Sequence, residues 1–397
     1  MSKDQKDPVV IVAAKRTPIG SFQGQFSNVS STKLGAAAIK AALTDSGLKP
    51  EDVSEVIMGC VLPAGLGQAP ARQASLGAGI PKDVGCTTVN KVCGSGMKST
   101  MLAHDMIAAG SADIVIAGGM ESMTNAPYII PGARAGLRMG HQQILDHMFF
   151  DGLQNPYDGQ MMGVFGELCA DKYKFTREQQ DAFAIESVKR AQTAIKDGTF
   201  KKEIVTITVK ERKGERVVDH DEQPGRSNIE KIPSLKPAFK KDGGTVTAAS
   251  SSSISDGAAA LVLMRESEAK KRGLKPLARI VGHAGFAQEP AWFTTAPVGA
   301  IDKLQKKLGW SEKDVDLYEI NEAFAVVAMA AMHDLKLPHE KVNVNGGACA
   351  LGHPIGCTGA RIIVTLLHAM LARKAKRGIA SLCIGGGEAT AIGLEAI

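Results

Sequence analysis

The sequence contains an internal repeat, and this repeat constrains the fold more than any other feature of the chain. Three segments recur in the same order and at nearly constant spacing, with glycines and apolar residues in matching positions: 47–54 with 309–316, 93–98 with 356–361, and 116–121 with 383–388. Short glycine turns recur in many α/β proteins, but three matches in one order favour duplication of a structural unit. We therefore expect two halves that are built alike.

Within each half, short apolar runs typical of strands alternate with longer runs typical of helices. Such alternation predicts a mostly parallel sheet with helices on its faces, the α/β class. We assign residues 1–121 to the first half, completed by about 254–275, and residues 276–397 to the second. Residues 122–253 differ from both halves in their residue pattern, and we assign them to an insert. A chain of 397 residues exceeds what one hydrophobic core usually supports, in agreement with this division.

Four segments have the pattern of helices: 32–45, 96–109, 322–335 and 354–373. The last three are apolar on nearly every side. Because a helix that is apolar all round is buried in a core, we expect these three to lie between two sheets. The pattern thus predicts a layered sandwich with central helices.

The insert contains an amphipathic helix that begins after Thr176, a residue type that caps helices well. It is also locally basic, with Lys201, Lys202 and several lysines between residues 231 and 241. An irregular basic segment beside a cleft can hold a phosphate-bearing ligand. Lysines on a solvated surface would give the same pattern.

Charge and cysteine content exclude some classes of function. The net charge of +6 is spread along the chain, so it permits an anionic substrate but does not indicate nucleic-acid binding, and no base-stacking motif is present. The apolar run at 9–14 is too short for a secretory or membrane-spanning segment. Seven cysteines, an odd number, favour free thiols in a reducing compartment. We expect a cytoplasmic protein without a membrane partner.

Two cysteines and one histidine lie in glycine-rich turns that are far apart in the sequence: Cys93, His353 and Cys383. Reactive side chains from distant turns are how many enzymes assemble a nucleophile and its base. Cys93 is followed by Gly94 and an apolar helix, so the helix N-terminus should lower the pKa of its thiol. A small buried core cysteine is the alternative.

The other reactive turns have their own alternatives. His353 precedes a proline that suits a helix start, where the helix dipole should keep the imidazole neutral as a base. Zinc is an alternative because Cys349, His353 and Cys357 are close in sequence, but the spacing is not that of a known metal loop. Backbone N–H groups around Gly385 can face an oxyanion. Asn321 ends a strand, and by itself it suggests a helix N-cap.

Four of these segments together resemble the catalytic loops of the thiolase family: 92–96, 321–324, 352–354 and 383–387, in the family's order and spacing. Segments 112–121 and 256–260 match as well, so the resemblance covers nearly the whole chain. One such loop is a weak signal, whereas four in order are specific. The resemblance implies a five-layer α-β-α-β-α sandwich of two similar halves, with an inserted loop domain that binds coenzyme A.

The same resemblance implies an acyltransferase that condenses two acetyl-CoA molecules reversibly to acetoacetyl-CoA and CoA. Cys93 would carry the acyl group after His353 takes its proton, and Cys383 would deprotonate the methyl group of the second acetyl-CoA. Asn321, through a water, would bind one thioester oxygen together with His353. The N–H groups of Cys93 and Gly385 would form a second oxyanion hole. Coenzyme A thioesters are substrates, and neither a cofactor nor a metal is expected.

The chain departs from the family's substrate-binding pattern in two places. In the loop at 249–253 the family usually has an asparagine and a glycine, where this chain has Ser250 and Ser253. Met161 stands where short-chain members commonly have a histidine, and a methionine-lined pocket can adapt to longer acyl groups. The residues expected to contact coenzyme A or the acyl group are Ser252, Met161, Met162, Ala323, Phe324 and Arg226.

Two other functions stay open. One is a 3-ketoacyl-CoA thiolase of broader chain-length range that works in fatty-acid degradation. The other is a catalytically silent relative that binds acyl-CoA or lipid, which the retained reactive residues disfavour. The resemblance also implies a homotetramer or a dimer.

Overall fold

The computed structural model describes residues 7–212 and 214–397, so the first six residues of the expected first half lie outside the described part. Fourteen strands are present there: β1 (Val9–Arg16), β2 (Gly20–Ser21), β3 (Glu55–Gly59), β4 (Gly85–Val89), β5 (Ile114–Ser122), β6 (Tyr128–Ile129), β7 (Leu145–Asp146), β8 (Ile207–Glu211), β9 (Gly214–Val218), β10 (Ser255–Arg265), β11 (Ala278–Ala287), β12 (Leu317–Ile320), β13 (Arg377–Ile384) and β14 (Glu388–Ala396). The α-helices are α1 (Ser31–Ser46), α2 (Pro70–Gly77), α3 (Ser95–Ala109), α4 (Met162–Tyr173), α5 (Arg177–Lys196), α6 (Glu222–Arg226), α7 (Glu266–Lys271), α8 (Ala296–Leu308), α9 (Ala325–Leu335), α10 (Ala348–Leu351) and α11 (Ile355–Arg373).

Ten strands form one continuous sheet that divides into two halves of the same design. The order is β4-β3-β5-β10-β1 followed by β11-β14-β13-β12, with the short β2 beside β10. The halves meet where β1 pairs with β11 at Ile11 and Ala278. Val342 bridges to Tyr318 of β12 and takes the place that β4 has beside β3. The predicted pair of similar halves is confirmed.

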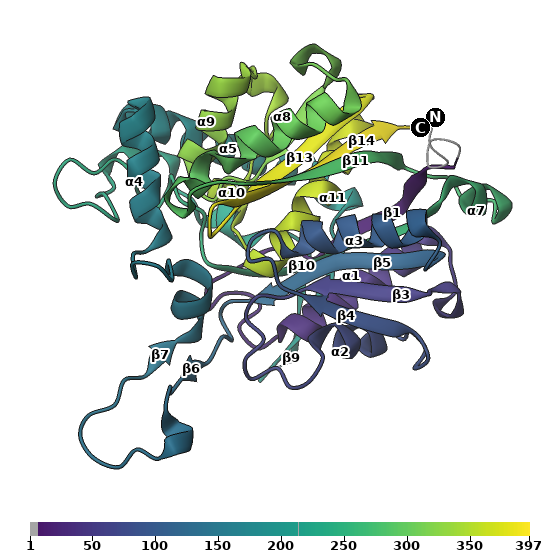
Figure 1. The fold of residues 1–397 in the computed structure, drawn as a ribbon, viewed down its shortest axis with the longest axis horizontal. Coiled ribbons are helices and arrows are strands. Elements are labelled where there is room, and N and C mark those ends of the chain that lie inside the picture. Colours follow the sequence, from purple (N-terminus) through teal and green to yellow (C-terminus); the bar gives the residue numbers. More distant parts are fainter. Residues whose placement is uncertain (1–6, 213) are drawn as a thin grey trace.

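The elements stack in five layers (Figure 1). α8 and α9 cover the outer face of the second half's sheet, α3 and α11 lie between the two half-sheets, and α1 and α2 cover the outer face of the first. Side chains alternate accordingly along β10, because successive residues of a strand point to opposite faces. Leu261 and Leu263 belong to the central core, whereas Val262 and Met264 pack with the outer helices. The predicted α-β-α-β-α sandwich is therefore confirmed.

The sequence repeat also reproduces local hydrogen bonds. A short 3-10 turn follows α1 in the first half and α8 in the second, just before β3 and β12 respectively. In the first turn the N–H of Lys49 donates to Asp52 Oδ2 at 2.8 Å. In the second the N–H of Ser311 donates to Asp314 Oδ2, also at 2.8 Å. The two copies thus share their capping chemistry as well as their strand order.

The two central helices cross at glycines that the repeat places in equivalent positions. A Cβ atom added to Gly96 of α3 would lie 2.7 Å from the backbone nitrogen of Ala360. A Cβ atom added to Gly359 of α11 would lie 2.3 Å from the backbone nitrogen of Met97. Because neither glycine has a side chain, the two backbones approach closely. This crossing brings together the turns that begin α3 and α11.

The expectation of a third central helix was wrong. The segment predicted at 322–335 becomes helical at Ala325, and α9 lies on the outer side of the second half rather than between the sheets. Its apolar surface is covered on one side by α8 and on the other by α4 of the insert, where Val326 and Val327 pack against Phe165 and Cys169. A helix that is apolar all round can be buried by an insert as well as by a second sheet.

Within the described residues, α11 is the helix that is long and apolar enough to cross a membrane, with a mean hydropathy of 1.6 over its most apolar stretch. That stretch is 83% buried inside the protein. Its apolar character is explained by its place in the central layer.

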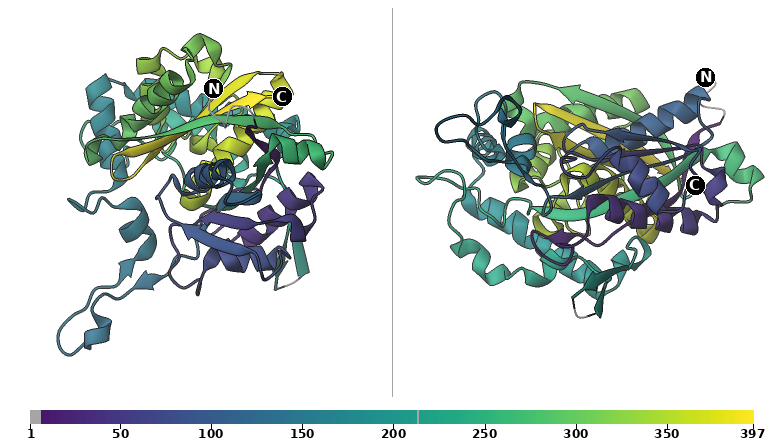
Figure 2. Two further views of the ribbon diagram at one scale, coloured as in Figure 1. Left: turned by 45° about the vertical axis from the view of Figure 1, so that its right-hand side comes forward. Right: turned by 90° about the horizontal axis from the view of Figure 1, so that it is seen from below.

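The insert packs around the body and also extends from it. α5 begins with the expected cap, because Thr176 Oγ1 accepts the N–H of Gln179 at 3.3 Å and Gln179 Oε1 accepts the N–H of Thr176 at 2.9 Å. The hairpin of β8 and β9 packs against the core beside α1. The segment containing β6 and β7 projects as an arm (residues 127–147) that stands clear of the layers in Figure 1 and in the left view of Figure 2.

Candidate active site

One largely apolar cavity of about 280 Å³ collects most of the residues that the sequence singled out. Cys93 comes from the turn between β4 and α3, His353 from the turn between α10 and α11, and Cys383 from the end of β13. Both halves therefore contribute to it, and the insert closes it. The lining also includes the predicted substrate residues Met161, Met162, Ser252, Ala323 and Phe324, together with Gly385.

Cys93 lies in a strained turn at one end of this cavity. Val92 before it has φ 46°, in the left-handed region that a β-branched residue rarely adopts. Burial raises the pKa of the Cys93 thiol to about 11, although the N–H groups of Gly385 and of Cys93 itself favour the thiolate. The expectation that the helix N-terminus would lower this pKa was wrong, because the apolar surroundings outweigh the N–H donors. Cys93 is therefore a neutral thiol at neutral pH.

His353 is buried, and its ring is oriented by one hydroxyl group. Its Nδ1 atom lies 2.6 Å from Thr358 Oγ1, and that hydroxyl donates to the carbonyl oxygen of Pro354 at 2.8 Å. The hydroxyl can then only accept from the ring, so the Nδ1 atom carries the proton and the Nε2 atom holds a lone pair. The Nε2 atom is buried without a hydrogen-bond partner among the described residues.

The pKa of His353 is lowered to about 3 by burial and, to a smaller extent, by the positive charge of Arg361. The expected neutral base is thus present, although burial rather than the helix dipole is the leading cause. Pro354 serves as the N-cap residue of α11 and not as its first helical residue.

Cys383 is fully buried, and burial together with the neighbouring Cys93 raises the pKa of its thiol well above the ordinary value. Cys93 and Cys383 line the same cavity, so their two sulfur groups lie within electrostatic reach of each other. Two like charges in one apolar cavity repel, so the two thiols cannot both ionise at neutral pH. Such a pair is suited to proton transfers that occur one after the other, and neither sulfur is a thiolate in the resting protein.

Asn321 does not cap a helix, because α9 begins at Ala325 with Phe324 as its N-cap residue. Its side chain is buried, and both Oδ1 and Nδ2 lack a hydrogen-bond partner among the described residues. An unsatisfied buried amide costs about 1–3 kcal/mol, so this side chain is suited to hold a water or a polar substrate atom.

Buried carboxylates that the sequence analysis missed hold the loops in place. Glu121 of β5 accepts the N–H groups of Val61 and Gly356, both at 2.9 Å, and so ties the first half to the turn that carries His353. Burial raises the pKa of Glu121 to about 7 despite these donors. Glu322 accepts from Ser187 at 2.7 Å and from the side chain of Asn343 at 2.7 Å. The only sequence signal for Glu121 was its place at the end of a repeated segment.

The serine-rich loop runs along one wall of the cavity. The N–H of Ser252 donates to the carbonyl oxygen of Ala323 at 2.9 Å, and Ser250 Oγ accepts the N–H of Thr247 at 2.8 Å. Arg226 does not line the cavity; it is exposed and pairs with Glu222 at 3.1 Å. Ser250 therefore stabilises the loop itself, whereas Ser252 faces the ligand space.

The zinc alternative at Cys349, His353 and Cys357 is not supported. In the described residues, 7–212 and 214–397, one group of three side chains could together bind a metal ion. It consists of His104, Asp105 and His283, and it does not include Cys349, His353 or Cys357. Cys349 instead contacts the backbone oxygen of Glu322 at 3.8 Å.

Two family models match consecutive parts of the chain. The thiolase N-terminal domain matches residues 9–267, and the thiolase C-terminal domain matches residues 274–396. Together they cover almost all of the sequence, and their junction falls between β10 and β11.

Named relatives and solved structures agree with these matches. The chain is 52% identical over 399 residues to acetyl-CoA acetyltransferase 1 of Arabidopsis thaliana (100% of this chain, 96% of the relative) and 50% identical over 388 residues to acetyl-CoA acetyltransferase of Pseudomonas aeruginosa (97% and 98%). The crystal structure of the Bacillus anthracis acetyl-CoA acetyltransferase superposes with a TM-score of 0.96 at 44% identity (98% and 99%). A thiolase from Ascaris suum in complex with coenzyme A superposes with a TM-score of 0.93 at 44% identity (98% and 100%). The chain belongs to the thiolase family.

Proposed function

We propose that this protein is an acetyl-CoA C-acetyltransferase, which joins two acetyl-CoA molecules to acetoacetyl-CoA and releases CoA. The observation that carries the proposal is the cavity in which two thiols, Cys93 and Cys383, meet a neutral imidazole with a free lone pair, that of His353. A carbon–carbon bond-forming acyl transfer needs a nucleophile to hold the acyl group and a base to form the carbanion. Relatives at about half identity along the whole chain carry the corresponding name.

In the first half-reaction, Cys93 attacks the thioester carbon of acetyl-CoA. His353 Nε2 takes the thiol proton as the sulfur–carbon bond forms, and it then gives that proton to the departing CoA sulfur. The N–H groups of Cys93 and Gly385 bind the negative oxygen of the tetrahedral intermediate. The pKa values support this order, because the half-buried thiol of Cys93 and the buried imidazole of His353 stay neutral until the substrate arrives.

In the second half-reaction, Cys383 first gives its thiol proton to His353 Nε2, and the resulting thiolate takes a proton from the methyl group of a second acetyl-CoA. The resulting carbanion attacks the acetyl group on Cys93, and the Cys93 sulfur leaves and takes back a proton from His353 as acetoacetyl-CoA forms. Asn321 and His353 hold the enolate oxygen, Asn321 acting through a water molecule. The unsatisfied amide of Asn321 supports this assignment. Thiolysis of acetoacetyl-CoA by CoA is the same path reversed.

The substrate contacts follow from the cavity lining. Ser252 and Phe324 face the space where the pantetheine chain would lie, and Met161 and Met162 lie beside it. Arg226 and the lysines of the insert are available for the CoA phosphates, although Arg226 would have to leave Glu222. No cofactor is required, since the thioester itself supplies the activated acyl group.

A second candidate, a thiolase of broader chain length, is favoured by one observation. The cavity is lined by Met123, Leu153, Met161, Met162 and Phe149, which are apolar and in part flexible. Methionine side chains adjust to irregular shapes, so this wall can accept a longer acyl group. Values of kcat/KM for 3-ketoacyl-CoA substrates of increasing chain length separate the two. A steep fall beyond acetoacetyl-CoA supports the first candidate, and a flat series supports the second.

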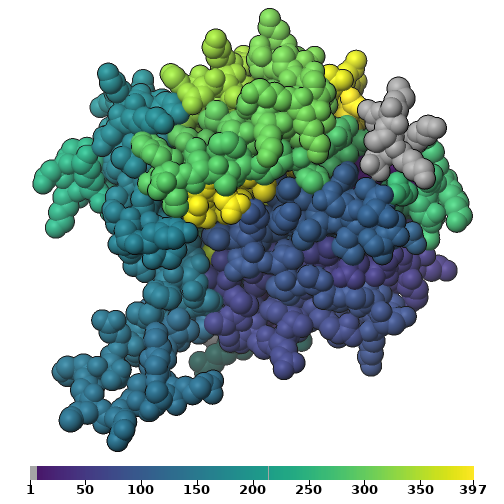
Figure 3. All heavy atoms as spheres, viewed as in Figure 1, coloured from purple at the N-terminus to yellow at the C-terminus, as the bar shows by residue number. Residues whose placement is uncertain are grey.

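The arm supports assembly into an oligomer, for which we propose a homotetramer. Tyr128, Met139 and Ile144 on the arm are 67%, 86% and 63% exposed. Figure 3 shows the arm standing away from the body of the protein. Exposed apolar side chains gathered on a projecting segment are typical of contact surfaces. Light scattering after size-exclusion chromatography should give four subunits, and a monomer would contradict the proposal.

The cysteines support a reducing compartment, for which we propose the cytoplasm. All seven lie in the described residues and none is paired, including Cys93 and Cys383 in the same cavity. A disulfide between these two would remove both reactive thiols. Fractionation of the source cells should find the protein in the cytosol, and its recovery in an organelle would contradict the proposal.

The activity itself has a direct test. Reduced, folded protein mixed with acetoacetyl-CoA and CoA should remove the absorbance of the magnesium enolate of acetoacetyl-CoA. Absence of thiolysis at neutral pH would refute the enzyme and favour a catalytically silent acyl-CoA-binding protein.

A further inference from the structure

A second cluster of reactive side chains lies where the two halves meet, away from the reaction cavity. It contains His104 and Asp105 near the end of α3 and His283 on β11. Cys93 precedes the start of α3, and a helix rises about 1.5 Å per residue, so the cluster is about 15 Å further along that helix. No step of the proposed reaction uses it.

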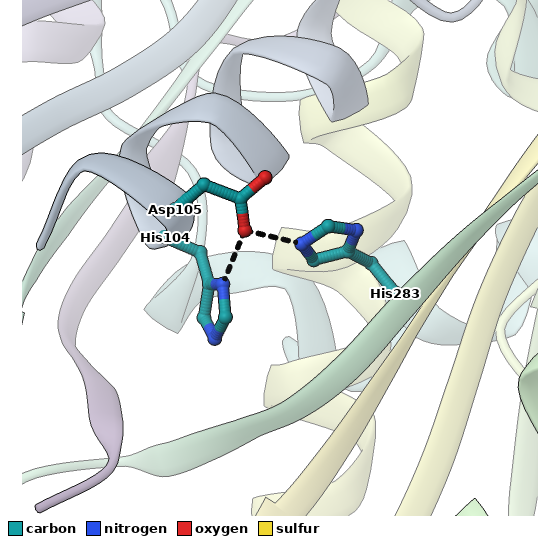
Figure 4. Close-up of side chains that lie close together, drawn as sticks. All are labelled: His104, Asp105 and His283. Carbon is teal, nitrogen blue, oxygen red and sulfur yellow. Dashed lines mark hydrogen bonds and ion pairs between the residues drawn. The ribbon is translucent and has the colours of Figure 1, made fainter. Parts of the chain in front are cut away.

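One nitrogen of each imidazole ring in this cluster faces the same carboxylate oxygen of Asp105 (Figure 4). His104 Nδ1 lies 3.0 Å from Asp105 Oδ1, and His283 Nε2 lies 2.8 Å from the same oxygen. All three ligand atoms lie within 4.8 Å of one another. The ligand atoms of a tetrahedral zinc site are about 3.3 Å apart, given bonds of roughly 2.0–2.1 Å. Small side-chain movements are therefore enough to place an ion between them.

A β-bulge in β11 turns His283 toward this cluster. Ile280 pairs with Leu394 and Gly282 pairs with Gly393, so Val281 is an extra residue in the strand. Before the bulge, Ile280 faces the central core, whereas after it Gly282 faces α8 on the outer side. The alternation is thus shifted by one residue, and His283 points inward to α3. Bulges are a common means of redirecting one side chain toward a site.

The cluster is accessible to solvent, and among the described residues no neighbouring cation occupies the carboxylate of Asp105. It borders an open cavity of about 1090 Å³, in which a bound ion could complete its coordination with water. The side chains of His104 and His283 are 20% and 14% exposed, and that of Asp105 is 54% exposed. The neighbouring Arg279 is paired with Glu266 at 2.8 Å, and Lys307 donates to the backbone oxygen of His283 at 3.3 Å. These cations therefore have partners of their own.

We propose that His104, Asp105 and His283 form a binding site for a divalent transition-metal ion of the zinc class, which joins the two halves of the protein. Two imidazole nitrogens and one carboxylate oxygen suit zinc and its neighbours, whereas calcium and magnesium prefer oxygen ligands alone. The ion bonds to His104 Nδ1, to Asp105 and to His283 Nε2, with water in the remaining position. Because α3 and β11 belong to different halves, the bound ion links the two halves. It takes no part in acyl transfer.

The test compares zinc stoichiometry among matched variants of the full-length, reduced protein. The variants are His283→Gln, Asp105→Asn and a control, His220→Gln. His220 contacts the adjacent Asp219 at 2.8 Å, much as His104 contacts Asp105, but this exposed pair has no second histidine. Zinc chloride alone is titrated in by calorimetry. Zinc bound by cysteines is common to all four proteins and cancels in the comparison.

The wild type and His220→Gln should each bind one more equivalent of zinc per chain than His283→Gln and Asp105→Asn. Zinc should also raise the melting temperature of the first two proteins and not of the other two. Thiolysis activity, which should be equal in all four, verifies that the variants are folded. Equal zinc stoichiometry in the wild type and His283→Gln would overturn the proposal. So would a zinc-soaked crystal without an anomalous peak at the cluster.

Discussion

At the scale of single residues, the site works through neutral groups. An isolated thiol at a helix N-terminus would be partly ionised, yet burial raises the pKa of Cys93 to about 11. Burial also lowers the pKa of His353 to about 3. A thiolate–imidazolium pair is therefore absent before substrate binds, and the proton moves to the imidazole only as the acyl group arrives.

The first prediction concerns the pH dependence of Cys93 alkylation. Only the thiolate reacts with iodoacetamide, so the rate at Cys93 should rise by about tenfold per pH unit from pH 6 to 9, since the whole range lies below the pKa. Peptide mapping by mass spectrometry separates Cys93 from Cys383. An alkylation rate at Cys93 that no longer changes with pH near pH 7 would show that its thiol is already ionised, and would contradict this account.

The second prediction concerns Thr358, whose hydroxyl fixes the tautomer of His353. Thr358→Val leaves the Nδ1 proton without an acceptor, so the ring can turn or change tautomer. We expect kcat to fall by about 10- to 100-fold, part of the ~10²–10⁴-fold that a positioned base contributes, while KM changes little.

The matched variant Thr358→Ser keeps the hydroxyl and should restore most of kcat. If Thr358→Val retained full kcat, or lost activity only through a raised KM, the hydroxyl would not position the base.

At the scale of elements, the site depends on how closely α3 and α11 approach. Each helix begins beside a reactive turn, so their crossing sets the distance between Cys93 and His353. Interiors are packed as densely as crystals and transmit such shifts. A change of spacing at the crossing therefore alters both stability and catalysis.

The third prediction is that Gly96→Ala destabilises the fold by about 1–3 kcal/mol, the usual cost of overpacking a core. The new Cβ atom would lie 2.7 Å from the backbone nitrogen of Ala360 and 2.9 Å from the backbone oxygen of Cys357. Urea unfolding measures the loss. Gly225→Ala in α6 is the control, because its Cβ atom meets nothing within 4 Å. Equal stability of the two variants would mean that the crossing tolerates a wider spacing.

At the scale of the whole molecule, the site is assembled by joining two copies of one unit. The residue pattern alone predicted the repeat, a layered sandwich with central helices, and a site that combines Cys93, His353 and Cys383, because glycine turns and strand patterns are local signals. The five layers followed from the resemblance to the thiolase family. The residue pattern did not predict the position of α9. A helix buried by the insert and a helix buried between two sheets have the same all-round apolar sequence pattern, so the pattern of α9 does not distinguish them. The sequence also did not predict the high pKa of Cys93 and the role of Thr358, because both depend on contacts with distant or differently folded segments.

The fourth prediction concerns Glu121, which joins the halves by accepting N–H groups from Val61, Leu62 and Gly356. Glu121→Gln has nearly the same shape but presents an NH₂ group to one of these donors. Since an unsatisfied buried polar group costs about 1–3 kcal/mol, stability in urea should fall by that amount. Activity should fall as well, because Gly356 follows the turn that carries His353.

Glu167→Gln is the matched control for Glu121. Glu167 accepts the N–H groups of Thr245 and Val246 but does not join the halves. Glu167→Gln should lower the free energy of unfolding to a similar extent as Glu121→Gln, but it should lower kcat less. Equal effects of both variants on kcat would remove the link between Glu121 and the His353 turn.

The division of labour between the two sulfurs is the central claim, and intact-protein mass spectrometry with acetyl-CoA tests it most directly. Cys93→Ala should show no acetyl adduct. Cys383→Ser should still gain the mass of one acetyl group, while its rate of acetoacetyl-CoA formation falls by about 10²–10⁴-fold, the usual contribution of a positioned base. An acetyl adduct on Cys93→Ala, or loss of the adduct in folded Cys383→Ser, would contradict the separate roles of Cys93 and Cys383.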